Sequence, residues 1–267
     1  MLIVRVQGIN GLGKTKGCEK AGNAVLRALN EIYSNEREIP IDAKILDLEE
    51  VHLDNSDLRL TSELIYKNSS EIFLEKPKTV FIGGDHSISY PITKSFFEYC
   101  KKAGKEPFLV VFDAHPDCME PDKNFPTNEE WLRALIQLGF PQENIFLIGV
   151  RNPDPSETVF LKKHRIKVMS MNQLLENLED SCDMIMEFSK NKELYISIDI
   201  DVVDPAFAPG TGYKEPGGLT SRQFLYLIQR LNKVKNLKAI DVVEINPEKD
   251  IGDLTVKLGA KILAELL

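Results

Sequence analysis

The stretch of sequence that decides the fold is Phe108-Leu109-Val110-Val111-Phe112-Asp113-Ala114-His115-Pro116-Asp117. Its first half is an unbroken apolar run, which is typical of a strand buried on both faces. Strands of this kind occur in parallel sheets that helices cover on both sides. The polar second half follows directly, so we expect it at the carboxyl end of the strand, where ligands gather in such sheets.

Similar short apolar runs recur along the chain and alternate with amphipathic stretches. The expected strands are Leu2–Val6, Lys44–Leu48, Thr79–Ile82, Phe108–Phe112, Asn144–Val150, Lys167–Met169, Leu194–Ile198 and Leu237–Val243. Helical spacing of apolar residues is found in Glu19–Ile32, Ile88–Lys101, Asn128–Leu138, Met171–Phe188, Ser221–Asn232 and Leu254–Leu267. The alternation predicts a three-layer α/β fold with a mainly parallel eight-stranded sheet. No linker or repeat divides residues 1–267, so we expect a single domain.

Composition excludes several classes of protein. The formal net charge of the 267 residues is -8, which argues against a general nucleic-acid binder because such proteins usually carry a basic face. No apolar stretch approaches the ~20 residues that would cross a bilayer, and no signal-like run follows the N-terminus. The four cysteines are widely separated, which favours reduced thiols over a disulfide framework or zinc site. We expect a cytoplasmic protein without a nucleic-acid or membrane partner.

Polar motifs follow four of the expected strands. Besides Asp113–Asp117, they are Gly83–Ser87, Asp199–Asp201 and Glu244. In extended chain, side chains two and four positions apart point to one side, so the carboxylates and imidazole of Asp113–Asp117 can converge. Taken alone, each motif could be a helix cap or a turn. Their joint occurrence at the ends of strands indicates a functional site.

The motifs that follow three of these strands supply four carboxylates and two imidazoles as candidate metal ligands. The six residues are His86, Asp113, His115, Asp117, Asp199 and Asp201. Crowding four carboxylates together is unfavourable unless cations neutralise them. Oxygen and nitrogen ligands without thiolate suit Mn²⁺, and less strictly Fe²⁺, Co²⁺ or Zn²⁺. Six ligands exceed the usual need of one ion, so the sequence favours a pair of ions.

The same motifs, together with Ala208–Gly212 and Glu215–Thr220, resemble those of the arginase–agmatinase (ureohydrolase) family over essentially the whole chain. The resemblance implies one arginase-like domain with an eight-stranded parallel sheet, two Mn²⁺ ions per chain, and assembly into a homo-oligomer, a trimer or hexamer. It also implies which residues hold each ion. One ion would be held by His86, Asp113, Asp117 and Asp199, and the other by Asp113, His115, Asp199 and Asp201.

The family resemblance further implies hydrolysis of a guanidino group to urea and an amine. A hydroxide bridging the ions would attack the guanidinium carbon, and Asp117 would accept a hydrogen bond from it. Glu244 would clamp the guanidinium through charge-assisted hydrogen bonds, which makes Asp117 and Glu244 the expected catalytic residues. A carboxylate at Glu244 favours a small guanidino substrate over the formimino-glutamate used by one branch of the family.

The segment Cys118–Trp131 departs from the family pattern. Arginases carry a proton-shuttling histidine there and nearby groups that hold an α-carboxylate, whereas this segment has no histidine. The proton donor is then Glu129, Glu130 or bulk water. Agmatine, which needs no α-carboxylate clamp, is preferred over arginine as the substrate. A metal-binding homologue with weak or no activity is left open. His52 and His164 are expected in a loop and at a solvated position.

A competing motif lies near the N-terminus. The segment Gly8–Thr15 fits the phosphate-loop pattern G-x-x-x-x-G-K-[ST], with Lys14 placed for phosphates and Thr15 for Mg²⁺. It would make the protein a P-loop-like nucleotide binder. However, the helical pattern begins only after Gly17, whereas a phosphate loop enters its helix at the Lys-Thr pair. Nucleotide binding is therefore the alternative function.

Overall fold

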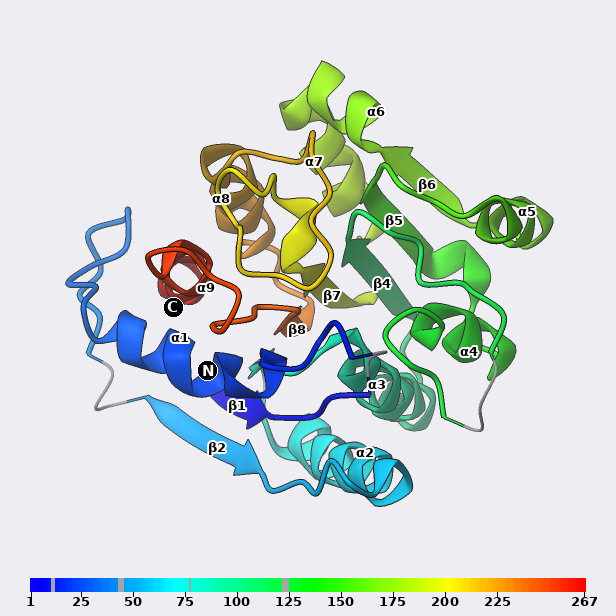
Figure 1. Cartoon of the computed structure of the whole chain (residues 1–267). Helices are drawn as coiled ribbons and strands as arrows, with labels where there is room; N and C mark the ends of the chain where they lie inside the picture. The colour runs from blue at the N-terminus through cyan, green and yellow to red at the C-terminus, as the bar shows by residue number, and fades with distance from the viewer. Residues whose placement is uncertain (11–12, 43–45, 77, 122–124) are drawn as a thin grey trace.

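The apolar runs assemble into one parallel sheet. The computed structural model describes residues 1–10, 13–42, 46–76, 78–121 and 125–267, and within them eight strands join in the order β2-β1-β3-β8-β7-β4-β5-β6 (Figure 1). Their bounds are β1 Leu2–Val6, β2 Asp47–Val51, β3 Thr79–Ile82, β4 Pro107–Phe112, β5 Ile145–Val150, β6 Lys167–Ser170, β7 Glu193–Asp199 and β8 Leu237–Val243. Every neighbouring pair is parallel, which confirms the expected fold class.

Helices cover both faces of this sheet. Their bounds are α1 Ala21–Leu29, α2 Leu58–Glu75, α3 Ser89–Ala103, α4 Trp131–Gln137, α5 Pro155–Lys163, α6 Met171–Glu176, α7 Leu178–Phe188, α8 Ser221–Leu231 and α9 Leu254–Leu266. Helices α1 and α6 to α9 pack on one face and α2 to α5 on the other (Figure 1). Strand β4 serves both cores, because Phe108, Val110 and Phe112 point to the first layer and Leu109 and Val111 to the second.

The first difference from the expected elements is at the edge of the sheet. Strand β2 lies at Asp47–Val51 rather than Lys44–Leu48, and residues 43–45 fall outside the described residues. An edge strand has one partner and one covered face, so its apolar pattern is weak. Here only Val51 is buried, and the parallel pairing with β1 sets the register.

Four helices also differ from expectation. Helix α2 was not expected because its buried stripe includes Thr61 and Ser69 beside apolar residues. Helix α5 was missed although Asp154 and Glu157 form a capping box at its start. The expected helix Met171–Phe188 is two helices, because Asn177 adopts an extended backbone and its side chain caps α7.

None of the described helices combines the length and the apolar character needed to cross a bilayer.

The strand order explains why the polar motifs meet. Strands β3, β8, β7 and β4 are adjacent at the centre of the sheet, and each of the four motifs follows one of them. Parallel strands have their carboxyl ends at the same edge, so Gly83–Ser87, Glu244, Asp199–Asp201 and Asp113–Asp117 are neighbours there.

Candidate metal centre and substrate cavity

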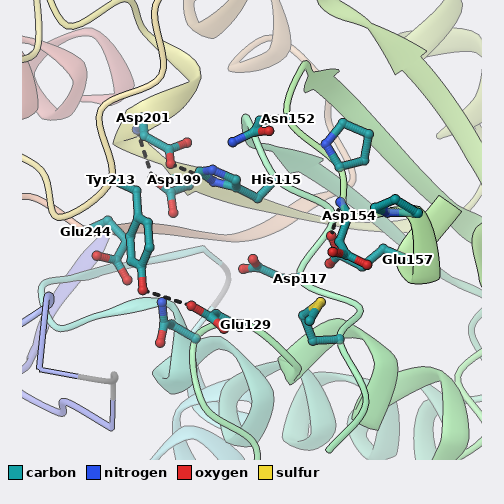
Figure 2. A pocket seen from close by; sticks show the side chains of 14 residues that line it. His115, Asp117, Glu129, Asn152, Asp154, Glu157, Asp199, Asp201, Tyr213 and Glu244 are labelled. Carbon is teal, nitrogen blue, oxygen red and sulfur yellow. Dashed lines mark hydrogen bonds and ion pairs between the residues drawn. The ribbon is translucent and has the colours of Figure 1, made fainter.

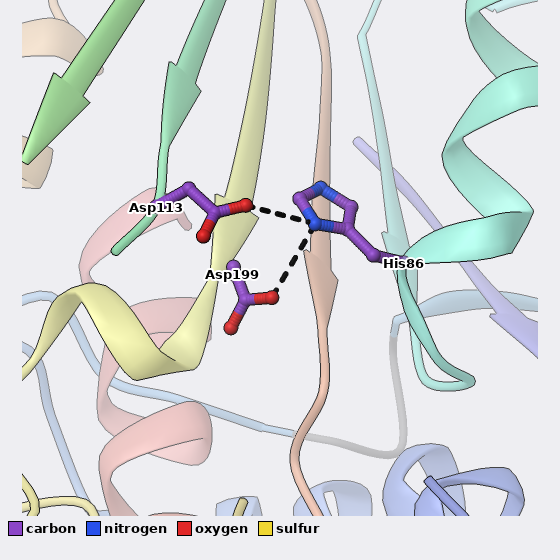
Figure 3. A group of neighbouring side chains, drawn as sticks. All are labelled: His86, Asp113 and Asp199. Carbon is purple, nitrogen blue, oxygen red and sulfur yellow. Dashed lines mark ion pairs between the residues drawn. The ribbon is translucent and has the colours of Figure 1, made fainter. Parts of the chain in front are cut away.

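His86 lies at the centre of the first group of polar side chains. It begins a short 3-10 helix after β3, and its Nδ1 atom is 3.1 Å from Asp113 Oδ2 and 3.3 Å from Asp199 Oδ2 (Figure 3). The Asp117 Oδ2 atom is 2.8 Å from the same nitrogen. The histidine is completely buried and the three carboxylates nearly so. The loop after β4 and the end of β7 thus direct three carboxylate oxygens at one imidazole nitrogen.

His115 forms a second group on the other side of Asp113. Its Nδ1 atom is 2.9 Å from Asp201 Oδ2 and 3.5 Å from Asp113 Oδ1. One ligand atom each from His86, Asp113 and Asp199 lie within 4.8 Å of one another, and the same holds for Asp113, His115 and Asp201. Asp113 belongs to both groups and offers a different oxygen to each imidazole. This arrangement can hold two cations side by side.

Two buried atoms in the first group have no hydrogen-bond partner within the described part of the chain. They are His86 Nδ1 and Asp113 Oδ2. The other ring nitrogen, His86 Nε2, lies 2.9 Å from the Ser197 hydroxyl, and that hydroxyl donates to Asp241 Oδ1 at 2.7 Å. Since Ser197 gives its proton to Asp241, His86 Nε2 must donate to Ser197, and Nδ1 is the ring nitrogen that faces the carboxylates. A cation that displaces the proton of Nδ1 would bind this nitrogen and the facing carboxylate oxygens together, so the residues present suit a metal ion.

Burial and mutual electrostatic interactions shift the pKa values of the side chains around His86 strongly. Burial lowers the pKa of His86, but the carboxylates Asp113, Asp117 and Asp199 outweigh burial and raise this pKa well above its ordinary value. Burial, followed by repulsion from Asp113, raises the pKa of Asp117 to about 7. Burial and repulsion from Asp201 raise the pKa of Asp199 well above the usual range. The ion-free cluster therefore holds protons where a cation would provide positive charge.

Asp117 and Glu244 both have a left-handed backbone. Their φ angles are 51° and 63°, which is uncommon for residues with a Cβ and is found preferentially at functional sites. Asp117 Oδ2 accepts a hydrogen bond of 2.8 Å from Trp131 Nε1. Glu244 Oε1 accepts one of 2.9 Å from the backbone N–H of His86, and the Cys18 thiol lies 3.7 Å from Glu244 Oε2. Both carboxylates are thus fixed in orientation.

A cavity of about 350 Å³ opens beside the cluster. Figure 2 shows Asp199, Asp201 and His115 at one end, Glu244 beside Tyr213, and Asp154 and Glu157 on the opposite wall. Burial, with a contribution from Asp85, raises the pKa of Glu244 well above its ordinary value, so a cationic ligand would favour its ionised form. The size and the polar lining suit a small organic cation.

The structure therefore brings together all six residues expected to bind metal, with Glu244 beside them. Sequence reasoning missed several neighbours because their side chains reach the site from loops and helix ends. They are Trp131, Asn128, Glu157, Tyr213 and Glu215, of which Glu215 Oε1 lies 3.3 Å from His115 Nε2. The capping-box pattern could have placed Glu157 at the start of a helix. No pattern in the sequence signals Tyr213 or Asn128.

The two carboxylates expected as proton donors differ in their access to the cavity. Glu129 lines the cavity and accepts a hydrogen bond of 2.8 Å from the Tyr213 hydroxyl. Glu130 is buried, and one of its oxygens accepts hydrogen bonds from the backbone N–H and hydroxyl of Thr127. Glu130 is therefore not placed as a donor to the cavity. His52 is exposed in a loop, as expected, whereas His164 is half-buried against Phe160, with ring centroids 4.3 Å apart.

The N-terminal loop has a different geometry from a phosphate loop. Residues 11 and 12 of Gly8–Thr15 lie outside the described residues. In the described part, the Thr15 hydroxyl donates to Asp85 Oδ2 at 2.9 Å, and the chain enters its first helical turn only at Cys18. A hydroxyl engaged by a buried carboxylate is not directed at a magnesium ion. This arrangement weighs against the nucleotide-binding alternative.

Comparison with known proteins agrees with the geometry of the cluster. The sequence profile described as "Arginase family" matches residues 8–267. The chain is 30% identical over 237 residues to the proclavaminate amidinohydrolase of Streptomyces clavuligerus, spanning 83% of this chain and 71% of that protein. It is 31% identical to the agmatinase of Bacillus subtilis, spanning 73% of this chain and 64% of that protein. It is also 31% identical to the mitochondrial arginase 1 of Arabidopsis thaliana, spanning 84% of this chain and 64% of that protein.

Solved structures share the fold over nearly the whole chain. A structure of the Streptomyces clavuligerus enzyme superposes with a TM-score of 0.88 at 26% identity, covering 99% of this chain and 89% of that one. A formimidoylglutamase structure from Bacillus subtilis gives the same TM-score at 24% identity, covering 99% and 84%. The names of these relatives refer to different substrates, so the similarity does not identify the substrate of this chain. With the family profile matched from residue 8 to residue 267, the chain belongs to the arginase family.

Proposed function

We propose that the protein is a two-manganese hydrolase that cleaves a guanidino group to urea and an amine, with agmatine preferred over arginine. The observation that carries the proposal is the pair of His–Asp groups that share Asp113 beside the buried carboxylate of Glu244. Two cations held there would lie next to a cavity whose wall attracts a third, organic cation.

The ligand atoms favour Mn²⁺ as the metal. His86, Asp113, Asp117 and Asp199 would hold one ion, and Asp113, His115, Asp199 and Asp201 the other. These ligands are oxygen and imidazole nitrogen without thiolate, as Mn²⁺ prefers. When bound, two such ions supply a Lewis-acid centre and an activated water near neutral pH.

The protein's own residues would position the substrate. Glu244 would accept charge-assisted hydrogen bonds from the guanidinium, since its Oε1 is already oriented by the His86 backbone. Asp117 would accept a hydrogen bond at the reacting centre, because its carboxylate lies beside His86 and lines the cavity. Trp131 holds that carboxylate in place through its Nε1 donor.

The wall of the cavity supports agmatine over arginine. Among the described residues that line it, none is Lys or Arg, whereas Glu129, Asp154 and Glu157 are carboxylates outside the metal groups. An α-carboxylate would meet negative charge there without a lining Lys or Arg to pair with, and like charges repel. Agmatine carries an ammonium at its far end and no carboxylate.

The first experiment is a urea assay with added Mn²⁺ on agmatine, arginine and shorter guanidino acids. Glu244→Gln should lower kcat/KM by about 10- to 100-fold, since a hydrogen bond to a charged group is lost. Glu248→Gln is the matched control, because Glu248 is exposed and pairs with Lys20 outside the cavity. Asp113→Ala should abolish activity. Urea release unaffected by Asp113→Ala would refute the proposal.

A metal-binding homologue with little activity is the second candidate. It is favoured by the absence of histidine from Cys118–Trp131, where arginases carry a proton shuttle. Metal analysis showing bound ions, together with no urea from any compound in the panel, would establish it. Binding of a labelled nucleotide by the wild-type protein, lost in Lys14→Ala, would instead support the phosphate-loop alternative.

A further inference from the structure

The cavity wall contains a buried amide oxygen without a donor. Asn128 is 5% exposed and lines the cavity, and its Oδ1 atom has no hydrogen-bond partner among the residues that the structure describes. The Tyr213 hydroxyl donates its single proton to Glu129 Oε1. Its hydrogen bond with the adjacent Asn128 side chain must therefore be one in which Tyr213 accepts and the Asn128 amide donates. The NH₂ group of Asn128 therefore faces Tyr213, and Oδ1 is left free. Buried acceptors are normally satisfied, which indicates that a ligand supplies this donor.

Glu129 lies next to this acceptor at the hydroxyl end of Tyr213. In Figure 2 Glu129 lies beside the hydroxyl of Tyr213, whereas Asp199 and Asp201 lie farther along the cavity, next to His115. One oxygen of Glu129 accepts from Tyr213 at 2.8 Å, and the carboxylate keeps further acceptor capacity. The two neighbours thus present acceptors at a point distinct from the metal groups.

The other carboxylates of the wall are engaged by the backbone. Glu157 accepts from the N–H groups of Cys118 at 2.7 Å and of Asp154 at 2.9 Å, and Asp154 caps the start of α5. The ammonium of Lys14 lies 4.3 Å from the centroid of the Tyr213 ring, but Lys14 is exposed and does not line the cavity. Glu129 is therefore the carboxylate best placed to meet a ligand.

We propose that Asn128 and Glu129 form a subsite that binds a primary ammonium at the far end of the substrate. This inference rests on the proposed function, because the far end is defined relative to the guanidino group. An ammonium has three N–H donors, one for Asn128 Oδ1 and one for the Glu129 carboxylate. Tyr213 is a positioning residue that orients both acceptors through its hydroxyl. A carboxylate-ended molecule would be rejected at this point.

The test compares guanidino compounds that differ only at the far end: agmatine, butylguanidine and 4-guanidinobutyrate. The wild-type protein should prefer agmatine over butylguanidine in kcat/KM by about tenfold or more. Glu129→Gln keeps the acceptor for Tyr213 but removes the charge, and Asn128→Leu removes the acceptor. Both should bring this ratio toward one, and Tyr213→Phe should lower it less. Glu75→Gln removes an exposed carboxylate on α2 and should keep the wild-type ratio.

A binding measurement keeps the subsite testable without turnover. The manganese-loaded protein is titrated with 1,4-diaminobutane and with butylamine, and the diamine should bind about tenfold more weakly to Glu129→Gln. If no compound releases urea but this loss is seen, the proposed function fails and the subsite stands. The other outcome is that urea is released while the kcat/KM ratio and the diamine affinity are both unchanged in Glu129→Gln and Asn128→Leu. That result would refute the subsite and leave the proposed function standing. Thermal unfolding without ligand checks that each variant is folded.

Discussion

The Nε2 atom of His86 lies 2.9 Å from the hydroxyl of Ser197, which in turn donates to the fully buried Asp241. Asp241 also accepts hydrogen bonds of 2.7 Å from Tyr195 and 2.9 Å from Ser89. This network orients the imidazole so that Nδ1 faces Asp113 and is the nitrogen available to a cation. The core between β7 and β8 therefore sets the chemistry of a side chain on the loop after β3.

Ser197→Ala should weaken Mn²⁺ binding by about 10- to 100-fold, because outer partners of metal-binding histidines have effects of this size. The affinity can be measured by competition with a fluorescent chelator. Ser69→Ala is the matched control, since Ser69 is equally buried but donates to the backbone of its own helix. Equal manganese affinity in the two variants would show that Ser197 does not orient the imidazole.

The two groups around Asp113 predict distinct metal contents. His115→Ala removes a ligand of the second group and leaves the His86, Asp113 and Asp199 set intact, so it should retain about one ion per chain where the wild type holds two. Asp113→Ala should lose both, because each group uses an oxygen of this residue. Inductively coupled plasma mass spectrometry after gel filtration gives the ratios.

His52→Ala is the control for the loss of an imidazole, since His52 is exposed in a loop. It should keep the full metal content. Two ions in His115→Ala, or one in Asp113→Ala, would contradict the shared-ligand arrangement.

Metal binding should strengthen as pH rises from about 5 to 8. The folded pKa of Asp117 is raised, by burial first and then by Asp113, from 3.8 to about 7. The stability that this group contributes is fully present below pH 3.8 and is lost as pH rises through about 7, because the folded chain then holds an ionised buried carboxylate. A cation offsets that charge, and each proton it displaces makes its affinity rise about tenfold per pH unit.

Thermal unfolding with and without Mn²⁺ at several pH values tests this expectation. The shift in Tm caused by the metal should grow with pH in the wild-type protein. In metal-free Asp117→Asn, stability should fall less steeply between pH 5 and 7 than in the wild type. A metal-induced shift that is constant across this range would contradict the prediction.

The sequence was informative about the centre of the sheet and much less so about its margins. Runs such as Phe108–Phe112 are buried on both faces, so their apolar character is continuous, and polar residues directly after them mark the carboxyl edge. The edge strand β2 and helix α2 have weak patterns because each is only partly covered. Burial on both faces therefore decides which elements can be recognised.

The same contrast holds within the site. His86 and Asp113 follow strands and Asp199 ends one, so their convergence could be inferred from the order of the motifs along the chain. Asn128 and Tyr213 reach the cavity from loops that pack against each other across the sheet edge, and loop packing has no period in sequence. The metal roles of the six residues and the homo-oligomer remain predictions.

Gly84 joins β3 to His86 and provides a prediction about how the loop holds its shape. Its φ angle is 77°, and a Cβ there would lie 2.3 Å from the backbone oxygen of Gly8. The Gly84 carbonyl accepts the Glu244 N–H at 3.0 Å, so this glycine also ties the metal loop to the substrate loop. Gly84→Ala should therefore lower the free energy of unfolding by about 2–4 kcal/mol, through the left-handed backbone and the backbone clash together.

Gly104→Ala separates these two causes. Gly104 also has a positive φ, of 65°, but a Cβ there would meet no atom within 4 Å. Gly104→Ala should therefore lower the free energy of unfolding by about 1–2 kcal/mol, through the strain of the left-handed backbone alone. Urea denaturation of both variants gives the difference, and the manganese affinity should fall in Gly84→Ala but not in Gly104→Ala. The clash with Gly8 is what distinguishes Gly84 from Gly104. Equal losses of stability in the two variants would therefore contradict the prediction that the close approach of Gly8 to Gly84 constrains the loop.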